Sequence, residues 1–199
     1  GIIRQELPSD SQFNNVLVLT DLNSQKFLLD ATDKHLSFDF IPESCLNGYG
    51  YIAVRQQSGW VELRNLTKTK IVIKCALEFE SENTASGKIS VVKSGYEAQA
   101  VRAGIAVNGH EKYWEDQFTK TNIKYVESSV SRSGDQNEFL VEDHIVEIPN
   151  LAGGTGDVIY FNTMIMGRIT ENPFKNNERK YPIDFSYPKE TSYMAKFKI

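Results

Sequence analysis

The chain has 199 residues, of which 40% are hydrophobic and 11% aromatic, a composition typical of a globular protein with a substantial core. Its net charge of -4 and its pI near 5.5 argue against a nucleic-acid partner. No apolar stretch approaches the roughly 20 residues that a membrane-spanning helix requires, and the first residues do not resemble a secretory signal peptide.

Residues 12–33, QFNNVLVLTDLNSQKFLLDATD, contain two apolar runs on either side of a polar turn. This pattern predicts a β-hairpin with strands at 15–20 and 26–31. If Asp21 and Lys26 close the loop, the numbers of paired residues sum to 47.

The predicted register brings Asn15 and Asp30 to the same face of the hairpin, because side chains alternate along a strand. A histidine at position 15 would be held in one tautomer by such an acid, as is the base of a catalytic triad. Asparagine has no group that takes up a proton near neutral pH, so Asn15 can orient a group but cannot activate a thiol. We therefore expect a hairpin with the layout of half a catalytic site but without its base.

Residues 34–69 lose the regular alternation and contain several glycines, as in SCLNGYGYIAVRQQSGWVEL, which predicts a connector between two units. Trp60 in this stretch is a candidate stacking surface for a sugar ring. Cys45 and Cys75 are the only cysteines, and their spacing does not decide whether they form a disulfide. We favour two small buried thiols, and neither cysteine lies in a zinc-binding motif.

From residue 69 onwards the sequence is mostly a succession of predicted strands. In 69–80, TKIVIKCALEFE, apolar residues alternate with polar ones, the pattern of a strand that is buried on one face. Further strands are predicted at 87–95, 122–130, 138–148, 156–169 and 191–199. Within 95–118, hydrophobic residues at i, i+4 spacing predict two short helices, interrupted at Asn108-Gly109. Tyr113 and Trp114 are expected in the core.

His35, His110 and His144 are the only imidazoles of the chain. Since Glu142 and His144 share a strand face, a weak metal site is conceivable there. We favour instead a surface strand edge that is kept soluble by its charges, and we expect no metal or cofactor. The glycines of 151–161 lack the spacing of a phosphate-binding loop and indicate a hairpin or loop.

The hairpin resembles the last strands of the transglutaminase-like catalytic core, a papain-like Cys-His-Asp module, as it occurs in large bacterial envelope proteins. In that family the first strand begins Phe-Asn-His, which is matched here by Phe13 and Asn14 with Asn15 in place of the histidine. The second strand ends Leu-Asp-Ala-Thr, matched by residues 29–32. IPESCLNGYGYI (41–52) is similar to the family's exit from the core.

NPFKNNERKYPIDFSYP (172–188) resembles part of the β-rich domain that follows this core, and it is the most specific of the matches. The resemblance implies that 1–35 are the end of the core, 36–64 a connector, and 65–199 an accessory domain with helices near 96–120. The expected fold class is α+β, mainly β: an antiparallel β-sandwich-like domain with a short helical pair, preceded by a β-hairpin from a transglutaminase-like core. The chain is expected to be a fragment of a longer protein.

The resemblance also implies a function. The family's nucleophilic cysteine precedes its histidine, whereas no cysteine precedes Asn15 here. We therefore expect a non-catalytic accessory or binding region of a degenerate transglutaminase-like protein of the bacterial envelope, periplasmic or secreted, with Asn15 and Asp30 as the degenerate site. The alternatives are part of an active cysteine protease or transamidase whose thiol lies upstream, and a secreted carbohydrate-binding or adhesion domain. Trp60, Arg179 and Tyr181 are candidate contacts for a protein or glycan partner.

Overall fold

A computed structural model describes residues 3–6, 9–46, 48–56, 58–64, 67–119, 121–136, 138–155, 158–172, 174, 175, 178 and 185–199. The protein is mainly β with an α+β fold: 42% of it is strand, and two helices accompany a five-stranded sheet and several small hairpins. The mainly β, α+β class expected from the sequence is therefore confirmed. No helix formed by the described residues has the length and apolar character needed to cross a membrane.

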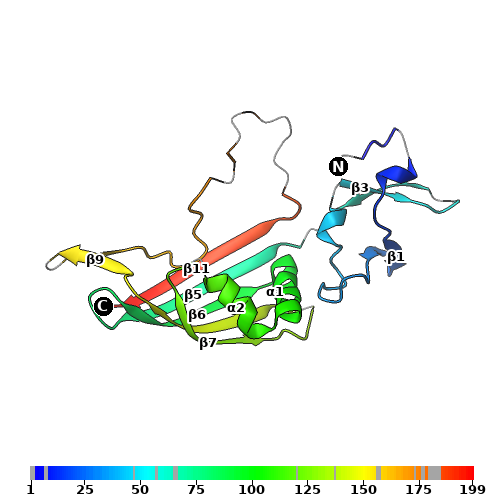
Figure 1. Ribbon diagram of the computed structural model, residues 1–199. Helices are drawn as coiled ribbons and strands as arrows, with labels where there is room; N and C mark the ends of the chain where they lie inside the picture. Colours follow the sequence, from blue (N-terminus) through cyan, green and yellow to red (C-terminus); the bar gives the residue numbers. More distant parts are fainter. Residues whose placement is uncertain are drawn as a thin grey trace.

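The long sheet has the strand order β11-β5-β6-β8-β7 (Figure 1). Its strands are β5 (Thr69–Phe79), β6 (Ala85–Lys93), β7 (Lys124–Ser131), β8 (Leu140–Ile148) and β11 (Lys189–Lys198). All neighbours pair antiparallel except β11, which runs parallel to β5 and makes the sheet mixed. The second layer consists of helices on one face, whereas a sandwich has a second sheet there.

Strand β5 shows why one face of this sheet is covered. Ile73, Cys75 and Leu77 are buried, while the intervening Lys74 and Glu78 are exposed, as the alternation predicted. The covering layer is made of α1 (Gly95–Asn108) and α2 (His110–Phe118). Both predicted helices are confirmed.

The two helices are separated at Gly109, whose φ of 77° lies in the left-handed region that glycine adopts at little cost. The turn lets both helices lie over the sheet (Figure 1). Val101 of α1 and Tyr113, Trp114 and Phe118 of α2 are buried in the core between the layers. Tyr113 and Trp114 therefore lie in the core, as the sequence indicated.

The strand predicted at 156–169 is wrong in its extent. β9 (Ala152–Thr155) and β10 (Val158–Phe161) form a short hairpin, and β10 ends at Phe161. The chain then follows an irregular path, in which Ile165 N–H donates a hydrogen bond to the Tyr193 hydroxyl at 2.9 Å. That segment packs partly buried side chains against the main core, so its apolar character comes from coverage of the sheet and not from pairing within it.

The N-terminal part consists of two further hairpins: β1 (Val18–Leu22) with β2 (Gln25–Leu29), and β3 (Gly48–Ile52) with β4 (Gly59–Leu63). Two short 3-10 turns accompany them, η1 (Asp10–Gln12) and η2 (Glu43–Cys45). The second hairpin is not predicted by the sequence pattern, because glycines interrupt its alternation. The chain division at 35 and 64 stays a prediction.

The register of the first hairpin is confirmed, since Val18 pairs with Leu29 and the paired numbers sum to 47. The pairing runs one step further towards the turn than expected and reaches Leu22 and Gln25. Asn23 and Ser24 form the two-residue turn with φ of 54° and 65°, the left-handed pair that characterises a type I′ hairpin.

The N-terminal unit lies at the end of the sheet where α1 begins (Figure 1). Its own hydrophobic cluster includes Phe40, Ile41, Cys45 and Leu63, and it extends to Tyr96 of α1. The Tyr96 hydroxyl donates a hydrogen bond to the Ile41 carbonyl oxygen at 2.6 Å, and the Tyr96 ring meets Phe40 edge-on. Packing and a buried hydrogen bond therefore join the two units.

Candidate functional site

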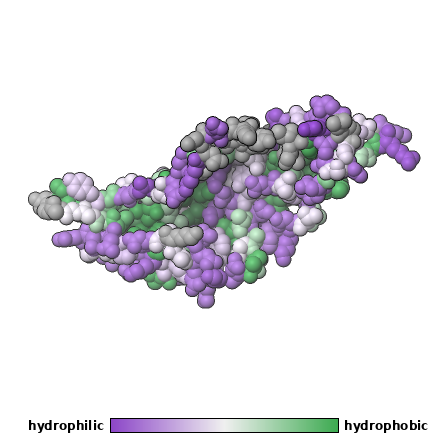
Figure 2. All heavy atoms as spheres, turned by 45° about the horizontal axis from the view of Figure 1, so that its top comes forward, coloured by the Kyte–Doolittle hydropathy of each residue, from purple (hydrophilic) through white to green (hydrophobic). Residues whose placement is uncertain are grey.

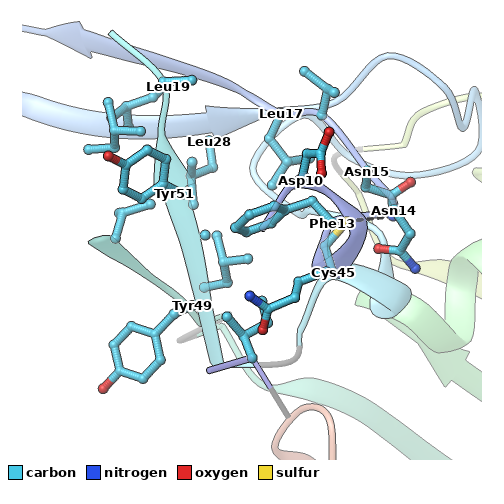
Figure 3. Close-up of a pocket in the computed structure, with 18 of the residues that line it drawn as sticks. Asp10, Phe13, Asn14, Asn15, Leu17, Leu19, Leu28, Cys45, Tyr49 and Tyr51 are labelled. Carbon is cyan, nitrogen blue, oxygen red and sulfur yellow. Dashed lines mark hydrogen bonds between the residues drawn. The ribbon is translucent and has the colours of Figure 1, made fainter. Parts of the chain in front are cut away.

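A pocket of about 600 Å³ opens between the two N-terminal hairpins (Figure 3). Its walls come from segments that are separate in sequence: residues 9–19 with η1, Leu28 of β2, the β3–β4 hairpin, and the single residues Ile3 and Cys45. Aliphatic side chains such as Leu19 and Leu28 form one side of it. The volume lies within the range of about 300–1,000 Å³ that is usual for small-molecule sites.

The first hairpin presents apolar side chains on both of its faces. Leu17, Leu19 and Leu28 line the pocket on the inner face. On the outer face, Val18 and Leu22 are exposed, whereas the exposed Val16 precedes the strand and lines the pocket. A hairpin that faced water would carry polar residues there, so the outer face has the composition of a surface that is covered.

The space-filling view shows how this surface compares with the rest of the protein. Figure 2 shows hydrophilic side chains over most of the visible surface, with hydrophobic patches both on the long sheet's unit and on the N-terminal unit. The exposed large hydrophobic residues of the N-terminal unit include Phe38, Tyr49, Tyr51 and Val54 in addition to the hairpin valines. Exposed apolar side chains thus lie around the pocket and on the outer hairpin face, as well as on the long sheet's unit.

Asn15 and Asp30 have different hydrogen-bonding partners. Asn15 Nδ2 donates hydrogen bonds to Ser44 Oγ at 3.1 Å and to Cys45 Sγ at 3.0 Å. An oxygen of Asp30 accepts a hydrogen bond from the Thr32 backbone N–H at 2.6 Å and another from the Thr32 hydroxyl. Strand pairing ends at Val18, so the shared face that the register implied does not extend to Asn15.

Asp30 therefore has the geometry of an Asx-turn, in which a carboxylate holds the backbone two residues further on. Asn15 reaches instead to η2, where it ties the strand entrance to Cys45 at the pocket wall. No local sequence pattern predicts this contact, because Asn15 and Cys45 are 30 residues apart.

Trp60 lies on β4 and is half-buried between two other aromatic rings. Its ring centroid is 5.2 Å from that of Tyr51, which it meets edge-on, and 6.2 Å from that of Phe13. These contacts use part of the surface that a stacked sugar would need. The other two candidate contacts, Arg179 and Tyr181, lie outside the described residues.

Both cysteines are free and buried. Cys45 lies in the N-terminal cluster at the pocket, and Cys75 lies in the core under the helices. Burial raises the pKa of the Cys75 thiol above its usual value, and a hydrogen bond with Tyr193 offsets part of this effect. The prediction of two buried thiols is confirmed.

His144 and Glu142 do not lie on a surface edge, so that interpretation is wrong. β8 lies between β6 and β7, and both side chains point towards the helical layer, where they are buried. His144 Nδ1 lies 2.7 Å from Ser128 Oγ, and its ring meets Trp114 and Phe118 edge-on. No group of three or more His, Cys, Asp or Glu side chains among the described residues is arranged to hold a metal ion.

Comparisons with protein-family models, with curated protein sequences and with solved structures found no match. The transglutaminase-like resemblance therefore rests on the motifs of the sequence alone.

Proposed function

We propose that this chain is a non-catalytic accessory or binding region of a degenerate transglutaminase-like protein of the bacterial envelope. The observation that carries the proposal is the pairing of Asn15 with Ser44 and Cys45, at the position where the resemblance implies a catalytic histidine. An amide cannot accept the proton of a thiol near neutral pH. The acid of the resemblance, Asp30, is engaged by Thr32.

A binding role is supported by the apolar surfaces of the N-terminal unit. A two-stranded hairpin is only marginally stable by itself in water, and this one has apolar side chains on both faces. The inner face lines the pocket, while Val18 and Leu22 are exposed on the outer face. Exposed apolar surface of this kind is typical of contact with a partner or ligand.

The carbohydrate alternative has less support, because Trp60 already contacts Tyr51 and Phe13. A Trp60→Ala variant distinguishes the two binding functions on a glycan array. If the unmodified chain binds a glycan and Trp60→Ala does not, the carbohydrate-binding domain is favoured over the accessory region.

The catalytic alternative is tested by a transamidation assay, with a glutamine peptide and a fluorescent amine, and by hydrolysis of a peptide library. The expected result is a rate equal to that of the Cys45→Ser/Cys75→Ser double variant. An Asn15→His variant is also expected to stay inactive, because Asp30 is held by Thr32 and does not face position 15. Turnover by the unmodified chain that is lost after alkylation of its thiols would overturn the proposal.

A further inference from the structure

The two edges of the long sheet differ in their regularity. β7 forms one edge, and its pairing with β8 is interrupted by an irregularity between Tyr125 and Glu127. Bulges of this kind blunt an edge against further strands. β11 forms the other edge, and its register with β5 runs without interruption from Lys189 to Lys198 (Figure 1). The sheet is therefore blunted at one edge and regular at the other.

The free edge of β11 carries the backbone groups of its odd-numbered residues. The Thr69 N–H donates a hydrogen bond to the Pro188 carbonyl oxygen at 3.0 Å, so the backbone of Pro188 faces β5. Backbone groups alternate between the two sides of a strand, and those of the odd-numbered residues therefore face away from β5. These residues are Thr191, Tyr193, Ala195 and Phe197. Within the described part of the chain, no other backbone group pairs with them at this edge, which offers the donors and acceptors that a further strand completes.

We propose that β11 pairs antiparallel with β11 of a second copy of this chain, so that the two sheets become one continuous sheet with a twofold axis at Met194. Such an interface uses the same surface on both sides of the axis. In this register Thr191 lies opposite Phe197 of the second copy, and Tyr193 lies opposite its Ala195. Each of these pairs exchanges two hydrogen bonds. The proposal is independent of the proposed function.

The charges of β11 are complementary to those of a second copy in this register. Glu190 lies opposite Lys198 of the second copy, and no two like charges are opposed. The side chains of Glu190 and Lys198 are 49% and 71% exposed beside Lys68 and Glu78, so both are able to reach across the new edge. Exposed ion pairs add little affinity, but they discriminate between registers.

Two further side chains favour an axis at Met194 over one at Tyr193, which would also oppose Glu190 to a lysine. Met194 pairs with an exposed position of β5 on the face away from the helices, is 51% exposed, and would be covered by its own copy. Tyr193 lies on the opposite face, where its hydroxyl accepts a hydrogen bond from the Ile165 N–H at 2.9 Å. A small residue opposite it, Ala195, leaves this ring in place.

The mass of the full chain in solution is the first test. Light scattering at increasing concentration is expected to show a mass that rises from 22.6 kDa towards twice this value. Ala195→Pro removes an N–H group that faces the free edge and leaves the pairing with β5 intact, because proline is tolerated at a strand edge. This variant is expected to raise the Kd of the dimer by about tenfold or more. Its urea denaturation midpoint shows whether it remains folded.

Cysteine substitution tests the register without a proline. Met194→Cys places two thiols across the twofold axis with Cα atoms about 4.5 Å apart, within the range that a disulfide bridges. Ser192→Cys is the matched control on the same face of β11, because its two copies lie more than about 13 Å apart. Mild oxidation is expected to give a covalent dimer of Met194→Cys alone, since the native Cys45 and Cys75 are buried.

Three outcomes would overturn the proposal. A chain that stays monomeric at about millimolar concentration would leave this edge to a strand of another protein or to solvent. A dimer that the folded Ala195→Pro variant leaves intact, or one that cross-links equally through Ser192→Cys, would show that the two copies meet elsewhere. None of these outcomes bears on the proposed function, which thiol-dependent turnover would contradict in a monomer or a dimer alike.

Discussion

Lys93 Nζ lies 2.6 Å from Glu142 Oε2, and this ion pair is buried between the sheet and the helices. The Glu142 side chain is 3% exposed and that of Lys93 is 16% exposed. Tyr113 of α2 also contacts Glu142: burial raises the pKa of the Tyr113 hydroxyl above its usual value, and the charge of Glu142 adds to this effect. The core of this protein therefore contains a buried carboxylate, that of Glu142, whose charge is balanced by Lys93.

Breaking the pair is expected to destabilise the protein. Lys93→Met leaves the Glu142 carboxylate buried without its cation, which costs about 3–5 kcal/mol in comparable buried pairs. The double variant Lys93→Met/Glu142→Leu is expected to recover most of this loss, because it removes both charges. Urea denaturation of the three proteins measures the free energies of unfolding.

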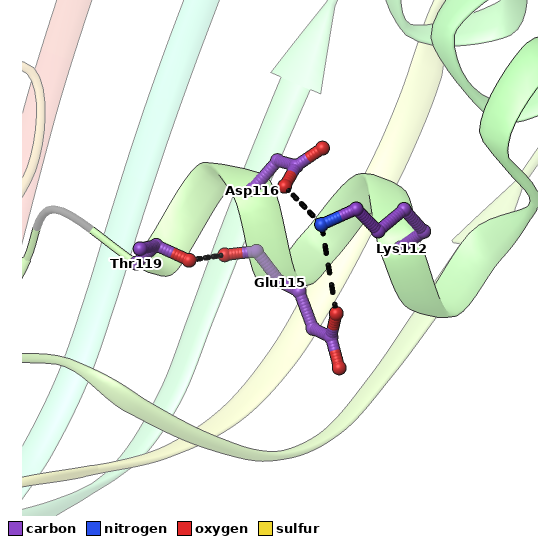
Figure 4. Close-up of polar contacts among 4 residues, drawn as sticks. All are labelled: Lys112, Glu115, Asp116 and Thr119. Atoms are coloured by element: carbon purple, nitrogen blue, oxygen red, sulfur yellow. Dashed lines mark hydrogen bonds and ion pairs between the residues drawn. The ribbon is translucent and has the colours of Figure 1, made fainter.

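An exposed ion pair on α2 provides the control. Figure 4 shows Lys112 between Asp116 and Glu115, with its Nζ atom 2.7 Å from Asp116 Oδ1. Lys112→Met is expected to leave the denaturation midpoint unchanged, because water screens such pairs. If Lys93→Met lowers the free energy of unfolding no more than Lys112→Met does, Lys93 does not stabilise the buried Glu142 carboxylate.

His144 is expected to make stability depend on pH. Burial lowers its pKa below the usual 6.5, and the nearby Glu142 carboxylate offsets part of this effect. As the pH falls through 6.5, the unfolded chain takes up a proton at His144 before the folded chain does, so the folded state loses stability. Above this pH the contribution is fully present.

The contribution of His144 is measured by replacing it with glutamine. The fall in unfolding free energy between pH 7.5 and pH 5 is expected to be smaller in His144→Gln than in the unmodified protein. His110→Gln, at an exposed position at the start of α2, is expected to retain the full fall. An unchanged pH dependence in His144→Gln would assign the effect to other groups.

Gly87 of β6 is expected to tolerate no side chain. Its φ is +147°, and a Cβ at this position would collide with the carbonyl oxygen of Ala76 on β5. Gly87→Ala should therefore cost about 2 kcal/mol or more, measured by urea denaturation. Gly59→Ala on β4 is the matched control, because a Cβ there meets no atom within 4 Å, and we expect a change within about 0.5 kcal/mol. Equal losses in the two variants would contradict this account.

Ser24 of the type I′ turn offers a stabilising change. Its φ of 65° is disfavoured for a residue with a side chain, so Ser24→Gly is expected to stabilise the β1–β2 hairpin by about 0.5 kcal/mol. Ser24→Ala keeps the side-chain strain and should give no gain. Amide hydrogen exchange in β1 and β2 measures the local effect. Faster exchange in Ser24→Gly than in the unmodified chain would show that the turn is not strained.

The sequence predicted those features that depend on neighbouring residues. The alternation in 69–80 indicated the buried face of β5, and the i, i+4 pairs around Gly109 indicated two helices. The hairpin register followed from the two apolar runs and the turn between them. Each of these patterns is local, and the folded chain has the secondary structure that each pattern predicts.

The errors concern features that depend on distant segments. Strand 138–148 carries charged residues, which indicated a surface edge, but β6 and β7 flank β8 and the helices cover Glu142 and His144. Their burial is possible because Lys93 and Ser128 supply partners from two other strands. Composition within one strand contains no information about such partners.

The sequence by itself determined the mainly β composition, the positions of the helices and most strands, and the absence of an imidazole at position 15. Only the tertiary structure decided that Asn15 meets Cys45, that Asp30 holds Thr32, and that segments far apart in the sequence enclose an apolar pocket. The reason is that side-chain periodicity fixes which face a residue occupies, whereas the contents of a site depend on which faces the folded chain brings together.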